Sequence, residues 1–145
     1  MKLVFDIETT PISVHDINLD SIDVIHCIVA QDVDSEEVFT FEPWELDAGV
    51  DLLNKASTLI GHNIIGFDIP ILTRLTSFEV GGKKIVDTLV ASRLFNPSRE
   101  GGHKLSAWGY RLGFPKIEVE EPEEFFKQYS QDMFCLLYTS PSPRD

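Results

Sequence analysis

Short stretches rich in β-branched and aromatic residues alternate with polar positions in the first third of the chain, and this pattern predicts β-strands. Three strands are expected, over residues 2–10, 24–30 and 37–41. The polar segment 31–35 has the length and chemistry of a hairpin connection between the second and third strands. The N-terminal part of the protein is therefore predicted to form an antiparallel sheet.

From residue 45 onward the hydrophobic spacing becomes that of helices separated by short strands. Residues 45–56 place Leu46, Val50 and Leu53 on one helical face. The further elements expected, in order, are a strand over 58–61, a helix opened by Asp68 with Pro70 in its first turn, a strand over 84–86, a helix from Asp87, a helix over 104–112 ended by Gly113, and a helix over 122–133. This order predicts an α/β fold with a mixed sheet flanked by helices.

The composition is that of one globular domain. The chain has 145 residues, of which 43% are hydrophobic and 25% charged, and this length can bury a sizeable core. No apolar stretch approaches the roughly 20 residues of a membrane span, and the N-terminus lacks the pattern of a signal peptide. We therefore expect a cytoplasmic protein without a membrane partner.

The formal net charge of −12 argues at first against a nucleic-acid partner. The charge is, however, unevenly distributed. Residues 74–116 hold eight of the twelve basic side chains and only three acidic ones, so this segment carries +5 and the remainder −17. An acidic body beside a basic segment suits a protein that holds metal ions in one place and phosphates beside it, and it suits a solvated surface as well.

Asp6 and Glu8 are the first candidates for chemistry. Side chains alternate faces along a strand, so these two carboxylates point the same way while Phe5 and Ile7 point into the opposite layer. Neighbouring carboxylates repel each other unless a cation or a proton lies between them, and hard cations such as Mg²⁺ prefer oxygen donors. A solvated strand end explains the same triplet, and the triplet alone leaves both readings open.

A second acidic position is Asp68, which follows the glycine-bearing segment 61–67. Aspartate at the start of a helix has an ordinary explanation as an N-cap, because its carboxylate accepts hydrogen bonds from the first free amides. Helix capping and metal binding both remain open for this residue.

The two acidic sites together resemble the motifs of a known superfamily. Asp6-Ile7-Glu8-Thr9 is similar to the Asp-x-Glu-Thr motif, and Asn63 to Asp68 to the Asn-x-x-x-(Phe/Tyr)-Asp motif, of the ribonuclease-H-like 3′→5′ exonucleases, which have four acidic metal ligands in three motifs. Residues 86–94 and 102–113 are similar to the proofreading domain of family A DNA polymerases, particularly those of tailed phages. The resemblance covers residues 1–134 and implies a ribonuclease-H-like fold.

The resemblance implies an enzyme that removes 3′-terminal nucleotides from DNA with two divalent metal ions, Mg²⁺ or Mn²⁺. Two such ions about 4 Å apart lower the pKa of a bound water and stabilise the departing 3′ oxygen. Asp6 would bridge both ions, Glu8 would lie on the side of the nucleophile, and Asp68 would act on the other ion. The implied partners are a single-stranded 3′ end of DNA and a polymerase domain in the same full-length chain, inside a bacterial or phage-infected cell.

Five further residues are candidate contacts to the substrate: Thr9, Asn63, Phe67, His103 and Arg111. Thr9 would lie near the terminal nucleotide, Asn63 near the sugar, and Phe67 would stack on a base, as aromatic side chains do in single-strand binding. His103 and Arg111 would contact phosphates. Three of them have an ordinary alternative: a strand-end threonine for Thr9, a core phenylalanine for Phe67 and a solvated loop for His103.

The third motif departs from the family pattern. The polymerase branch has Tyr-x-x-x-Asp on its last helix, whereas Tyr129 and Asp132 have two residues between them, and one missing residue rotates an aspartate by about 100° around a helix. We therefore interpret Asp132 as a helix-surface acid. Residues 135–145 resemble a translated sequencing adapter, so we expect an exonuclease domain over 1–134 that is incomplete at its C-terminus, a disordered non-native tail, and impaired activity.

Two other functions remain open. One is a stand-alone exonuclease of the same superfamily that acts on DNA or RNA. The other is a catalytically silent nucleic-acid-binding domain, although a silent domain has no physical reason to keep three converging acids.

Overall fold

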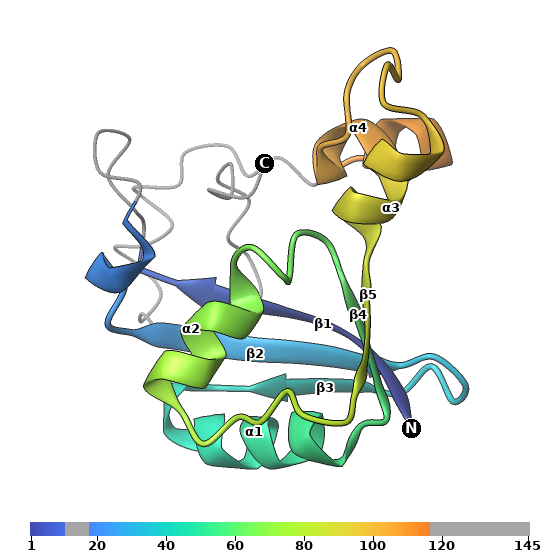
Figure 1. The fold of residues 1–145 in the computed structure, drawn as a ribbon. Helices are drawn as coiled ribbons and strands as arrows, with labels where there is room; N and C mark the ends of the chain where they lie inside the picture. Colours follow the sequence, from blue (N-terminus) through green and yellow to red (C-terminus); the bar gives the residue numbers. More distant parts are fainter. Residues whose placement is uncertain (11–17, 117–145) are drawn as a thin grey trace, which may run out of the picture.

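The computed structural model describes residues 1–10 and 18–116. The helix expected over 122–133, with Tyr129 and Asp132, and the proposed tail over 135–145 lie outside these residues. The elements within them form a mixed sheet and its helices (Figure 1).

Five strands form one sheet in the order β3-β2-β1-β4-β5. They are β1 (Lys2–Thr9), β2 (Ile25–Asp32), β3 (Val38–Phe41), β4 (Thr58–Gly61) and β5 (Lys84–Asp87). The first three are antiparallel, whereas β4 pairs in parallel with β1 and β5 in parallel with β4. The expected α/β fold, with three antiparallel strands followed by alternating helices and strands, is confirmed.

The hairpin between β2 and β3 turns later than the sequence predicted. Strand β2 continues to Asp32, whose carboxylate accepts hydrogen bonds from the amides of Asp34 at 2.8 Å and Ser35 at 2.9 Å. Glu36 then takes a left-handed conformation with φ 63°. An aspartate that binds the amides two and three residues later fixes a turn by itself, so the chain reverses after Asp32.

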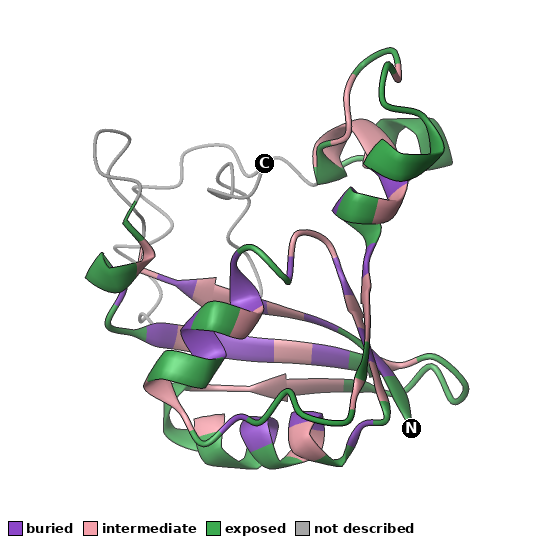
Figure 2. Ribbon diagram, viewed as in Figure 1, coloured by how far each residue is buried: buried purple, intermediate pink, exposed green. Residues whose placement is uncertain are grey.

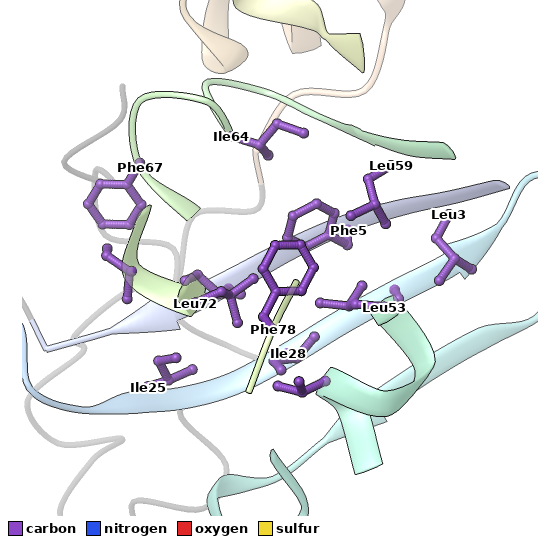
Figure 3. Packing of buried hydrophobic residues seen from close by; sticks show 14 of the residues in the cluster. Leu3, Phe5, Ile25, Ile28, Leu53, Leu59, Ile64, Phe67, Leu72 and Phe78 are labelled. Atoms are coloured by element: carbon purple, nitrogen blue, oxygen red, sulfur yellow. The ribbon is translucent and has the colours of Figure 1, made fainter. Parts of the chain in front are cut away.

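One face of the sheet is covered by α1 (Leu46–Lys55) and α2 (Asp68–Leu75). The buried core joins side chains of β1, such as Phe5 and Ile7, to Leu53 of α1 and Leu72 of α2 (Figures 2 and 3). Both helices present their apolar residues at helical spacing to the sheet, as the sequence predicted. Two short 3-10 helices that the sequence did not predict, η1 (Leu19–Ser21) and η2 (Pro43–Glu45), lie in the connections.

The last described elements are α3 (Thr88–Phe95) and α4 (Leu105–Leu112), which form a helical hairpin beyond the end of β5 (Figure 1). Gly113 ends α4 in the left-handed conformation, with φ 78°, which glycine adopts without steric cost. Many apolar side chains of this hairpin are exposed, among them Leu94 at 78% and Phe95 at 85%. In the part of the chain that the structure describes, no helix has the length and apolar character needed to cross a membrane.

Candidate active site

Asp6 and Glu8 lie on the face of β1 that points away from the core. Leu3, Phe5 and Ile7 are buried on the other face, and both acids are half-buried. The alternation predicted from the sequence is therefore observed. Because β1 is the central strand, both carboxylates lie over the middle of the sheet and not at its outer edge.

Asp68 is brought to the same strand by the start of α2. Its Oδ1 accepts a hydrogen bond from the backbone amide of Ile7 at 3.1 Å, and its side chain is 0% exposed. The N-cap of α2 is Phe67, and no side chain caps the helix. Asp68 is therefore the first residue of α2 and not its N-cap, and its carboxylate reaches across to β1.

The ladder between β1 and β4 explains why this contact is possible. Their register pairs only Lys2 to Val4 of β1 with β4, which ends at Gly61. The amide of Ile7 therefore lies past the end of β4, on a stretch of β1 where the neighbouring strand no longer supplies acceptors. A buried amide needs an acceptor, and Asp68 provides one.

The bond to Ile7 places the Asp68 carboxylate at the peptide group between Asp6 and Ile7, so residues from both sequence motifs meet at one strand. Carboxylate oxygens are the donors that hard divalent cations take. Within residues 1–10 and 18–116, however, no group of three or more His, Cys, Asp or Glu side chains is gathered tightly enough to hold a metal ion. The donor chemistry fits such ions, but the three acids do not form such a group within these residues.

The loop between β4 and α2 is shaped by tight backbone approaches. A Cβ on Gly61 would lie 2.3 Å from Cγ2 of Ile64 and 3.0 Å from the carbonyl oxygen of Phe5. Asn63 takes a left-handed conformation with φ 60°, which asparagine tolerates better than most residues, and its Oδ1 occupies the space where a side chain on Gly66 would begin. Gly61 and Gly66 therefore allow the close packing of the loop that positions Asp68.

Asp87 lies under this loop at the end of β5. Its carboxylate accepts from the amides of Leu89 and Val90 and so caps α3, as the sequence predicted. The same carboxylate also accepts from the amides of Asn63 and Ile65. This second role has no local sequence signal, because Asp87 and these two amides are more than twenty residues apart in the chain.

Thr9 and Phe67 have local roles in the structure. Thr9 is nearly buried at the end of β1, and its hydroxyl donates to the carbonyl of Thr10 at 3.2 Å. Phe67 is 5% exposed and packs in the hydrophobic core (Figure 3). The ordinary alternative of a core phenylalanine matches this burial, which leaves little ring surface for a base.

His103 and Arg111 belong to the α3–α4 hairpin and are used within it. The ring nitrogens of His103 lie 2.8 Å from Oγ of Ser92 and 3.2 Å from the carbonyl of Pro97. Arg111 donates to the carbonyls of Glu100 and Gly102. Both side chains therefore hold the 96–102 loop against the two helices.

Trp108 of α4 links the two helices of this hairpin. Its Nε1 donates to Oγ of Ser92 at 3.0 Å, and the guanidinium groups of Arg99 and Arg111 lie 4.7 and 4.9 Å from its ring centroid. Guanidinium groups at this distance are attracted to the ring face. A cavity of about 460 Å³ opens beside the ring, and His62 from the loop after β4 contributes to its lining.

The residues named from the sequence thus fall into two groups. One group lies along the C-terminal half of β1 or against it and consists of Asp6, Glu8, Thr9 and Asp68. The other group lies in the α3–α4 hairpin (Figure 1) and consists of His103 and Arg111. Between them runs the loop that carries Asn63. This loop connects the acids, through Asp68, to the start of the hairpin, through Asp87.

A mixed five-stranded sheet with acids on its central strand, flanked by helices, is consistent with the ribonuclease-H-like fold of polymerase exonuclease domains. The chain is 30% identical over 146 residues to the DNA-directed DNA polymerases of Escherichia phage T7 and of Enterobacteria phage T3, and each match covers 82% of this chain. It is homologous to a segment of these polymerases, as an exonuclease fragment of such a polymerase would be. No protein-family model matches it.

A structural comparison agrees on the fold. The family B DNA polymerase of the hyperthermophilic archaeon Pyrobaculum calidifontis superposes with a TM-score of 0.54 at 18% identity, over 77% of this chain and 18% of that one. The chain spans about a fifth of the length of the phage polymerases that it matches (20%).

Proposed function

We propose that this chain is the 3′→5′ proofreading exonuclease part of a phage-type DNA polymerase and that it hydrolyses the 3′-terminal phosphodiester of single-stranded DNA. The observation that carries the proposal is the hydrogen bond between Asp68 Oδ1 and the amide of Ile7, which joins the two acidic motifs at one point of β1. The homology to phage DNA polymerases supports it independently.

The chain's own residues would perform three tasks. Asp6 and Glu8 present two carboxylates side by side from a rigid central strand, where the packing of Phe5 and Ile7 fixes their direction. Asp68 adds a third carboxylate from the first turn of α2. Such a site concentrates negative charge where a cation and a phosphodiester can meet.

Asp6, Glu8 and Asp68 are the residues that would hold two Mg²⁺ or Mn²⁺ ions. When bound, such ions neutralise the phosphodiester charge, lower the pKa of a water and stabilise the departing 3′ oxygen. Because the family pattern has four acidic ligands and Asp132 lacks the expected spacing from Tyr129, the proposal includes a fourth acid elsewhere in the full-length protein. The 145-residue chain would then bind metal weakly and turn over slowly.

The α3–α4 hairpin would guide the strand that enters the site. Arg99 and Arg111 against Trp108 combine positive charge with an aromatic ring, which is how proteins bind single strands without reading their sequence. His103 and Arg111 would act by fixing the 96–102 loop, since their polar atoms are used there. The polymerase domain of the same full-length chain would supply the mispaired 3′ end.

The test is a comparison of three proteins on a single-stranded oligonucleotide with a 5′ label, in Mg²⁺ and in Mn²⁺. We expect the full-length protein to release mononucleotides from the 3′ end, its Asp6→Ala variant to lose this activity, and the 145-residue chain to be nearly inactive. If the Asp6→Ala variant released 3′-terminal nucleotides as fast as the unmodified protein, the proposal would be contradicted. Binding without any hydrolysis by the full-length protein would instead favour a silent nucleic-acid-binding domain.

A further inference from the structure

Asp87 uses its carboxylate on two separate segments of the chain. Oδ1 accepts from the amide of Leu89 at 2.9 Å and from that of Val90 at 3.4 Å, which caps α3. Oδ1 also accepts from the amide of Asn63 at 2.9 Å, and Oδ2 from that of Ile65 at 3.0 Å. The side chain is 5% exposed, so these bonds are shielded from water.

We propose that Asp87 is a positioning residue for the acidic site: by holding the amides of Asn63 and Ile65, it sets Asp68 against β1. The inference rests on the proposed function, since it concerns the same site. Asp87 itself touches neither the Asp68 carboxylate nor, in the proposed mechanism, the substrate, and it acts through the loop between them.

The path from Asp87 to Asp68 is short and has little freedom. Asp87 holds the residues on either side of Ile64, whose side chain is fully buried in the core. The carbonyl of Ile64 accepts from the amide of Ile69 at 2.9 Å, and this bond closes the loop onto the first turn of α2. Asp68 lies directly before Ile69, so the loop bonds fix where its carboxylate begins.

Capping of α3 does not by itself explain this arrangement. Serine, threonine and asparagine cap a helix about as well as aspartate, and each does so with one oxygen. Asp87 has a second oxygen that α3 does not use, and the amide of Ile65 occupies it. If the loop between β4 and α2 took another path, Asp87 could still cap α3, and its Oδ2 would be exposed to solvent.

The two roles can be separated by substitution. In Asp87→Ser the hydroxyl can still cap α3, but one oxygen cannot also serve Asn63 and Ile65. In Asp87→Asn the amide oxygen can keep the bonds of Oδ1, while the amide nitrogen faces the amide of Ile65, donor against donor. We therefore expect the loop to loosen more in Asp87→Ser than in Asp87→Asn.

The amide of Ile7 reports on the outcome, because its hydrogen bond to Asp68 protects it from exchange. We expect its hydrogen-exchange rate, followed by NMR on the 145-residue chain, to rise about tenfold or more in Asp87→Ser, because the bonds that hold the loop and Asp68 against β1 are lost. The rise should be smaller in Asp87→Asn. The amides of Leu89 and Val90 should stay protected in both. The control Asp32→Ala, which removes two amide bonds at a remote turn, should not affect Ile7.

Two results would overturn the inference. One is an unchanged rate at Ile7 while the amides of Asn63 and Ile65 exchange faster. The other is a rise at Ile7 that is matched by the other amides of β1, which would show general loss of structure in both variants.

The catalytic consequence is measured in the full-length protein. We expect Asp87→Ser to lower kcat about tenfold with KM for DNA unchanged, because a displaced Asp68 affects the reaction and not the strand. An unchanged kcat would contradict the positioning role. If hydrolysis by the full-length protein did not depend on Asp6, the proposed function would be refuted. The exchange rate at Ile7 would still test the positioning role of Asp87 by itself.

Discussion

At the scale of single residues, the contact between Asp68 and the amide of Ile7 combines two properties that substitution can separate. The oxygen of Asp68 satisfies a buried backbone amide, and its charge contributes to the acidic site. A neutral side chain of the same shape keeps the first property and loses the second. Stability and activity should therefore respond differently to the same position.

We predict that Asp68→Asn keeps the stability of the chain and that Asp68→Ala does not. The asparagine oxygen can accept from Ile7, whereas alanine leaves that amide buried without this acceptor, at a cost of about 1–3 kcal/mol. Urea unfolding of the two variants measures the difference. Equal losses of unfolding free energy would mean that the bond to Ile7 does not stabilise the fold.

The same residues show which features of the site can be predicted from the sequence. The common direction of Asp6 and Glu8 followed from strand alternation, which needs only local geometry. The position of the Asp68 carboxylate did not, because its acceptor role depends on where β4 ends. Pairings such as Asp87 with Asn63 depend on tertiary structure and carry no local signal.

At the scale of elements, strands and helices were predicted where their hydrophobic period is strong. Strand β4 matches its expected range of 58–61. Helix α1 is shorter than expected by one residue at each end, and α4 begins one residue later than expected. The 3-10 helices were missed because three residues are too few to show a period. The turn after β2 was predicted too early in the chain, because Asp32, whose carboxylate stabilises the turn, is also typical of a loop.

The end of β4 should tolerate no side chain. We predict that Gly61→Ala lowers the free energy of unfolding by about 1–3 kcal/mol, as overpacking does, because the new Cβ would meet Ile64 and the backbone of Phe5. Gly81→Ala is the matched control, since nothing lies within 4 Å of a Cβ there. Similar unfolding curves for both variants would show that β1 and β4 can separate without loss.

The β2–β3 hairpin should respond to pH through Asp32. The amides of Ser35 and Asp34 lower the pKa of this carboxyl from its ordinary value of 3.8. Its contribution is therefore present above about pH 4, the unfolded value, and is lost as the pH falls through the lower folded value. We expect the stability difference between the native chain and Asp32→Asn to shrink between pH 6 and about pH 3 in unfolding experiments; a difference that grows on acidification would contradict this.

At the scale of the whole molecule, the sequence indicated an acidic body with one basic segment, and the fold separates the two in space. The acids of β1 lie on the sheet, while Arg99, Lys104 and Arg111 lie on the helical hairpin (Figure 1). What the sequence could not indicate is that the two regions are joined through the loop after β4. Charge counts along a chain contain no information on such adjacency.

The hairpin should bind single-stranded DNA through Trp108. We predict that Trp108→Leu weakens binding of a fluorescent oligonucleotide by about 1–3 kcal/mol, the usual worth of one base stacked on an aromatic ring. Trp44→Leu is the control, because Trp44 is exposed on η2, away from the hairpin. Anisotropy titrations that give the same affinity for both variants would contradict a role of the hairpin in binding the strand.

The shortness of β4 has a consequence for how such a site can change in sequence. Four residues of β4 pair beside β1 and then stop, so a side chain completes the next backbone contact of β1 in place of a strand. An insertion that lengthened β4 by a few residues would bring a main-chain carbonyl to Ile7 and displace Asp68. Insertions before Thr58 or after Leu75 would leave this spacing alone, so tolerance to length changes should fall abruptly between Gly61 and Asp68.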